Sequence, residues 1–78
     1  MSYKAEPTGR AGLEYAENDR KVFIDSEMLV GHEFDMVVYL ESIVGWDVPR
    51  GEPVSAMDKA RIRSNIAEAF KSQRIDWQ

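Results

Sequence analysis

Two short stretches of alternating apolar residues flank Asn18-Asp19, and they constrain the fold more than any other part of the chain. Asn and Asp tolerate positive φ better than most residues, so the pair can form the tight turn of a β-hairpin. With these two residues as the loop, the facing pairs are Glu17 with Arg20, Tyr15 with Val22, and Leu13 with Ile24. That register places four apolar side chains on one face, and a slip of one residue would turn all of them over. The sequence therefore predicts antiparallel strands near 12–17 and 20–25.

A third strand is predicted over residues 34–41, because every even position in this segment is apolar: Phe34, Met36, Val38 and Leu40. The even positions are expected to face the core. Residues 42–54 are irregular, since they contain two glycines and two prolines.

A helix is predicted over residues 56–72. Ser55 can cap its first turn, and Asp58 stands where the acid of a capping box belongs. Its apolar stripe consists of Ile62, Ile66, Ala69 and Phe70. Ile75 and Trp77 alternate with polar residues, which is compatible with a short last strand.

The predicted fold class is α+β: a small antiparallel sheet of three to four strands with one C-terminal helix packed on one face. The element order is β-β-β-α, with room for a final short β. At 78 residues the chain has the size of one small domain. Residues 1–10, which contain Pro7 and Gly9, are expected to form a flexible N-terminal arm, and residues 11–78 a single α+β domain.

The charge of the chain is distributed unevenly. Residues 22–49 hold six carboxylates and no Lys or Arg, whereas the whole chain has a net charge of −4. A negative surface opposes direct binding to nucleic acid, whose affinity comes largely from cations that face phosphates. It favours a basic protein partner through steering and complementarity, although such a surface can also serve solubility alone.

One helix cannot cover both faces of a sheet, so the second face of the predicted sheet needs an explanation. The predicted register leaves on it the candidate partner-binding residues Phe23, Asp25, Asp35, Val37, Tyr39 and Glu41, together with Glu14 and Lys21. Aromatic and apolar anchors within a charged rim are typical of protein interfaces. Exposed aromatics also occur in strands without a partner. This face is therefore expected to be solvated, dimerised, covered by the N-terminal arm, or bound to a partner.

Chemistry-bearing residues are sparse. The chain lacks cysteine, and His32 with its neighbouring acids fits no standard ligand spacing, so it is interpreted as a loop histidine. Asp25 and Asp35 come with no nucleophile or phosphate cradle. The helix cations Lys59, Arg61 and Arg63 are interpreted as solvating the helix, and Trp46 as capping one end of the core. We therefore expect no enzyme activity, no cofactor and no metal.

Membrane insertion and export are not expected either. No run approaches 18 apolar residues, and the first six residues contain no apolar signal core. A cytoplasmic location is the corresponding expectation.

Three segments carry a resemblance to a known family. They are Val22–Leu29, then Val37–Ile43 running on to Trp46, Asp47 and Pro49, and finally Gly51–Ser55 at the start of the helix. The most specific pattern is Tyr-x-x-Ser-Ile-x-x-Trp-Asp, at Tyr39, Ser42, Ile43, Trp46 and Asp47. Together they resemble the immunity protein 74 family of bacterial polymorphic toxin systems. The resemblance implies a small α+β protein that is encoded beside a toxin gene and neutralises the toxin by binding.

The sequence thus leads to a small acidic domain that binds a protein partner, expected to be a basic toxin domain. The six candidate residues above form the predicted contact surface, with no direct contact to nucleic acid or membrane. The alternative is a structural or homo-oligomerising module without a toxin partner. The chain is expected to be a monomer or a homodimer.

Overall fold

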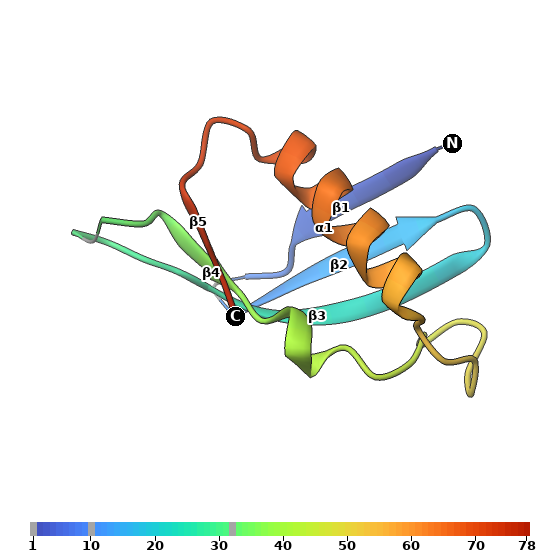
Figure 1. Ribbon diagram of the computed structural model, residues 1–78. Helices are drawn as coiled ribbons and strands as arrows, with labels where there is room; N and C mark the ends of the chain where they lie inside the picture. The colour runs from blue at the N-terminus through green and yellow to red at the C-terminus, as the bar shows by residue number, and fades with distance from the viewer. Residues whose placement is uncertain (1, 10, 32) are drawn as a thin grey trace.

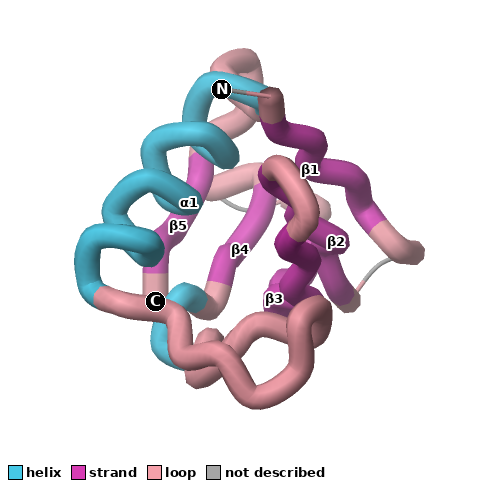
Figure 2. The backbone as a smooth tube through the Cα atoms, turned by 90° about the vertical axis from the view of Figure 1, so that its right-hand side faces the viewer, coloured by secondary structure: helices cyan, strands magenta, loops and turns pink. Residues whose placement is uncertain are grey.

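The computed structural model describes residues 2–9, 11–31 and 33–78. They form one five-stranded sheet with the strand order β1-β2-β3-β4-β5 and one α-helix, which crosses one face of the sheet (Figure 1). The elements are β1 Tyr3–Pro7, β2 Gly12–Glu17, β3 Arg20–Met28, β4 Met36–Val38, the 3-10 helix η1 Leu40–Ser42, α1 Ala56–Ala69 and β5 Ile75–Trp77. Viewed from the side, α1 lies to one side of β1–β3 (Figure 2). The α+β class is therefore confirmed.

The β2–β3 hairpin has the register that the sequence predicts. Its Cα partners include Glu17 with Arg20, Tyr15 with Val22, and Leu13 with Ile24. Asn18 adopts a φ of 53°, as the tight turn requires of its first residue. The side chains of Leu13, Tyr15, Val22 and Ile24 are all buried.

The prediction of a flexible N-terminal arm is wrong for residues 3–7. Tyr3–Pro7 form β1, which pairs antiparallel with residues 13–17 of β2. Tyr3 stacks on Tyr15 with their ring centroids 6.3 Å apart, and both Tyr3 and Ala5 pack against the core. Low apolar content misled the prediction, because an edge strand needs only its backbone and two inward side chains to join a sheet.

The third strand is shorter than predicted. Only Met36–Val38 form β4, and Phe34, expected on the core face, is 37% exposed. After Tyr39 the chain turns into η1, where the Ser42 hydroxyl and backbone N–H both donate to the Tyr39 carbonyl. Glu41 therefore belongs to η1 and not to a strand.

The short last strand exists, and it makes the sheet mixed rather than wholly antiparallel. β5 pairs parallel with β4, with Met36 opposite Ile75 and Val38 opposite Trp77. Parallel neighbours need a long crossover, and α1 lies within the segment that joins these two strands.

Helix α1 starts as predicted and ends three residues early. The Ser55 hydroxyl accepts from the Asp58 backbone N–H, and the Asp58 carboxylate accepts from the Ser55 N–H, each at 3.0 Å. Ile62 and Ile66 are fully buried. Ala69, assigned to the same stripe, is exposed, because the helix ends there and the stripe passes to Phe70 at the C-cap.

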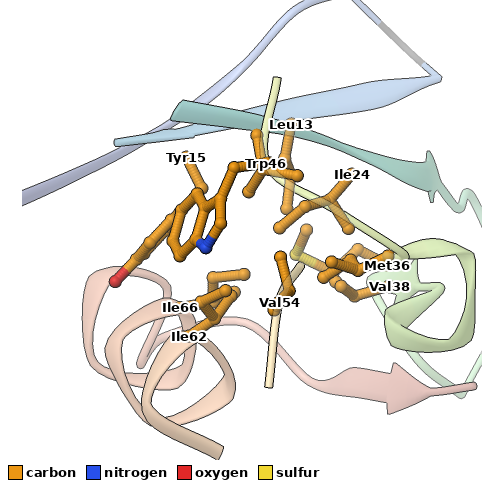
Figure 3. Packing of buried hydrophobic residues seen from close by; sticks show 11 residues of the cluster. Leu13, Tyr15, Ile24, Met36, Val38, Trp46, Val54, Ile62 and Ile66 are labelled. Atoms are coloured by element: carbon orange, nitrogen blue, oxygen red, sulfur yellow. The ribbon is translucent and has the colours of Figure 1, made fainter. Parts of the chain in front are cut away.

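The core lies between α1 and the sheet and is closed by the irregular segment 43–54 (Figure 3). Three of its residues come from that segment: Ile43, Trp46 and Val54. Trp46 is 3% exposed, in agreement with its interpretation as a cap on the core. His32 lies outside the described residues.

Candidate functional site

No other layer formed by the described residues covers the face of β1–β3 that is turned away from α1, and we call it the open face. Cross-strand partners share a face, so the register with Glu14 opposite Phe23 and Ala16 opposite Lys21 defines it. Its exposed side chains are Lys4, Glu6, Glu14, Lys21, Phe23, Asp25 and Glu27. Four carboxylates and two lysines give this surface a formal charge of −2. The open face is therefore acidic around a single large aromatic residue.

Phe23 is the apolar centre of the open face. Its side chain is 48% exposed, whereas its neighbours in sequence, Val22 and Ile24, are buried under α1. Strand alternation separates them in this way, so the sequence prediction placed all three correctly. Asp25 lies two residues further along the same strand and is exposed on the same face.

Asp47 and Val48 extend this surface, and sequence analysis did not assign them to it. The Asp47 Oδ2 atom accepts a 2.7 Å hydrogen bond from the Phe23 backbone N–H. Val48 forms an isolated antiparallel bridge with Lys21 and is 50% exposed. β4 pairs only with residues 26–28 of β3. Asp47 and Val48 therefore provide the hydrogen-bond partners for the backbone of β3 nearer the turn, at Lys21 and Phe23. No local sequence pattern in residues 44–50 predicts this pairing. The only available signal is that β4 is too short to pair with the first half of β3, which leaves that edge of β3 free for another segment.

The structure does not place the other four predicted site residues on the open face together with Phe23 and Asp25. Val37 is 8% exposed, and its register partners are Glu27 on β3 and Asp76 on β5. It is therefore unavailable as a contact residue. Tyr39 follows β4 and is half-buried, and its backbone N–H donates to the Asp25 carbonyl.

Asp35 and Glu41 are engaged elsewhere. The Asp35 carboxylate accepts a 2.8 Å hydrogen bond from the Arg74 backbone N–H and lies 3.4 Å from Arg74 Nε. These contacts, the backbone one first, lower the pKa of Asp35. Glu41 lines a depression of about 240 Å³ between η1 and α1, beside Lys59 and Arg63. Asp35 therefore lies beside Arg74 and Glu41 lies between η1 and α1, so neither residue is on the open face.

A buried polar network lies on the opposite side of the sheet, under α1. Arg61 Nη2 is 2.6 Å from Glu17 Oε2 and 2.7 Å from Asp58 Oδ1, and Arg61 Nε also donates to Glu17. The Tyr15 hydroxyl donates to Glu17 at 2.8 Å and accepts from Asn65 at 2.8 Å. The interpretation of Arg61 as a solvating cation is therefore wrong, because its guanidinium ties the helix to β2.

Protonation within this network follows from its contacts. Burial opposes ionisation of Glu17, but the hydrogen bonds from Arg61 and Tyr15 outweigh it and lower the pKa of Glu17. Burial raises the pKa of Tyr15 to about 12. The backbone N–H of Ser55, followed by Arg61, lowers the pKa of Asp58 to about 2. The network is thus a charged, satisfied structural element.

Arginine also covers two tryptophans of this protein. The Arg20 guanidinium carbon lies 5.3 Å from the ring centroid of Trp46, and that of Arg63 lies 5.0 Å from the centroid of Trp77. Arg20 additionally pairs with Glu52 and Asp58. The cations of the α1 side are therefore largely engaged within the chain.

Within residues 2–9, 11–31 and 33–78, no group of three or more His, Cys, Asp or Glu side chains could hold a metal ion. No helix there is long and apolar enough to cross a membrane.

Comparison with known proteins gives one result. Curated proteins and solved structures yielded no match. The family model of Immunity protein 74 matches residues 8–77, a range that begins just after β1 and ends at the last residue of β5. Because this range covers nearly the whole chain, the protein belongs to the Immunity protein 74 family.

Proposed function

We propose that this protein is a non-catalytic immunity protein that neutralises a cognate bacterial toxin by binding it through the open face. The observation that carries the proposal is the uncovered acidic surface around Phe23, in a chain of the Immunity protein 74 family. Phe23 supplies apolar contact area, and the surrounding carboxylates attract a basic toxin domain. We place the encounter in the cytoplasm.

The contact surface differs from the one that the sequence predicts. We retain Phe23 and Asp25, and we add Glu14 and Val48 because the register places them on or beside the same exposed surface. We omit Val37, which is buried, and Asp35, which is bonded to Arg74. A contact patch centred on β2 and β3 follows.

A protection experiment tests the proposal. The product of the reading frame beside this gene is produced in a bacterial host together with wild-type protein, with Asp25→Lys, or with Glu68→Lys. Glu68 is an exposed carboxylate on α1 and makes the same charge change away from the open face. We expect Asp25→Lys to lose protection and to associate more slowly with the purified toxin, whereas Glu68→Lys behaves as wild type. Equal protection by both variants would contradict the assigned face.

The rival function, a homo-oligomerising module, is tested by sedimentation. Phe23→Glu is the suitable variant, because its side chain is exposed and the substitution leaves the core intact. A stable wild-type dimer that dissociates in Phe23→Glu would favour the rival. A monomer that binds the toxin supports the immunity function.

A further inference from the structure

Strand alternation places Phe23 on the open face, and the absence of a side chain at Gly12 leaves room for its ring there. A Cβ atom at position 12 would clash with the Cζ and Cε1 atoms of the Phe23 ring. The ring tip therefore rests on the backbone of β2, in a space that any other residue would fill. A glycine in a strand often marks a place where another group approaches the backbone closely, and here that group is the ring of Phe23. The ring is held in place while about half of the side chain stays open to solvent.

Carboxylates surround this ring. Glu14 stands directly opposite Phe23 on β2, and Asp25 stands directly opposite Gly12 on β3. As direct partners in an antiparallel pair, Glu14 and Phe23 have Cβ atoms about 4.5–5.5 Å apart, and Asp25 stands two residues from Phe23 on the same face of β3. Among the described residues, no Lys or Arg nitrogen lies within 4.0 Å of either carboxylate. Lys4 on β1 and Lys21 on β3 line a shallow depression together with Glu14, and neither of them lies beside Asp25 in the strand register.

Two contacts elsewhere in the molecule show how an aromatic ring of this protein binds a cation. Two other aromatic rings are each covered by an arginine at about 5 Å, one of them with carboxylates bound to the same guanidinium. No cation of the described residues covers Phe23 in this way. A guanidinium is planar and weakly hydrated, so it can lie on a ring and bond to flanking carboxylates at once, which an ammonium does less well.

We infer that Phe23, Glu14 and Asp25 form a receptor for one arginine side chain of the protein partner. The guanidinium lies over the exposed ring and donates to the two carboxylates. This inference rests on the proposed function for its occupant, but it makes a separate claim: the surface selects arginine over lysine. Gly12 is the positioning residue, because it sets the height of the ring above the sheet.

The test uses small probes, so that its result does not depend on the toxin. The full-length protein is titrated with Nα-acetyl-arginine amide while backbone amide and Phe23 ring resonances are followed by NMR. The lysine analogue and the uncharged citrulline analogue are the matched probes. We expect saturable shifts at Gly12, Glu14, Phe23 and Asp25, about two- to five-fold weaker binding of the lysine analogue, and no such response to citrulline.

Variants separate the receptor from general acidity. Phe23→Leu keeps an apolar cover over Gly12 and should lose the preference for arginine, whereas Glu33→Gln, a loop carboxylate, should not. Gly12→Ala should displace the ring resonances and weaken arginine binding. Arg10, two residues from Gly12 in the sequence, is a cation of the chain itself, so the titration is repeated in Arg10→Ala, where the same shifts are expected.

Two results would overturn the receptor. One is an equal response to the arginine and citrulline analogues, and the other is shifts spread evenly over all acidic residues with Phe23→Leu unchanged. Either result leaves the protection experiment unaffected. Loss of protection in Asp25→Lys combined with no arginine selectivity would therefore reject the receptor and keep the immunity function.

Discussion

Glu17 shows how far a residue's role can depend on a partner remote in sequence. The hairpin register places it correctly opposite Arg20, yet its carboxylate bonds to Arg61, 44 positions away, and not to the residue across the turn. The alternation that puts Tyr15 on the core face also puts Glu17 there, so its charge needs a buried partner. Sequence alone cannot say which helix cation reaches it, because that depends on the rotation and depth of the docked helix.

Replacement of Glu17 by Gln should reveal the strength of this contact. The variant loses the charge that both Arg61 and Tyr15 bond to, so we expect the free energy of unfolding to fall by about 1.5–3 kcal/mol. Urea unfolding followed by circular dichroism measures it. Glu14→Gln, an exposed acid on the same strand, should stay within about 0.5 kcal/mol of wild type; a similar loss in both variants would show that the network is not specific.

The candidate site could be predicted in part, for reasons seen in two residues. Phe23 and Val37 are both on the outer side of their strands by alternation, and both were predicted as contacts. Alternation gives the face of a side chain but not the number of neighbouring strands. Both strands have a neighbour on each side, yet Phe23 is 48% exposed and Val37 only 8%. The exposure of a side chain depends on its size and its tertiary surroundings, which alternation does not give.

At the level of elements, those with strong local signals were predicted well. The Asn18-Asp19 turn and the Ser55–Asp58 capping box are both present, because their determinants lie within a few residues. β1 and the bridge of Val48 to Lys21 were missed, because each depends on an edge that another element offers. Edge pairing is a backbone property and leaves little trace in side-chain pattern.

The capping box of α1 makes stability depend on pH in a defined window. The pKa of Asp58 is lowered to about 2 in the folded protein, below the value of about 3.9 for an unfolded Asp. Its stabilising contribution is therefore complete above about pH 4 and is lost as the pH falls toward 2. Urea midpoints measured across this range should fall more steeply for wild type than for Asp58→Asn. If the urea midpoints of wild type and Asp58→Asn fell equally with pH, the capping box would not be the source of the pH dependence.

The packing of α1 on the sheet can be tested at its centre. Ile66 is fully buried, and Ile66→Ala should lower the free energy of unfolding by about 2–5 kcal/mol through lost burial and the cavity left behind. Chemical denaturation gives the value, with Ala67→Ser on the exposed side of the helix as control. A midpoint equal to wild type would mean that the helix is not docked through this stripe.

For the whole molecule, the cation-free stretch does not fold into one acidic patch. Its six acids are dispersed. Asp25 and Glu27 lie on the open face, and Asp47 lies beside it. Glu33 lies in the loop before β4, Asp35 pairs with Arg74, and Glu41 lies in η1. The negative character of the open face also depends on Glu6 and Glu14, which precede the stretch. The run of acidic residues in the sequence therefore predicted the negative charge of the open face, but not which residues form it.

Steering by the open face should make association with the toxin depend on salt. Exposed charges are screened beyond about 10 Å at 0.1 M ionic strength, so the association rate constant should fall as NaCl is raised from low to high concentration. Stopped-flow measurement checks this, and the dissociation rate constant should change less. An association rate indifferent to salt would contradict electrostatic steering.

The pairing of β4 with β5 has a consequence for the order of assembly. It joins Met36 to Ile75, whereas the hairpin that carries Phe23 closes around a two-residue loop. Nearby segments meet sooner than distant ones, so the β2–β3 hairpin should form first and the parallel pairing of β4 with β5 last. The β2–β3 part of the open face would then form early in folding, and it would become rigid only when β5 pairs with β4.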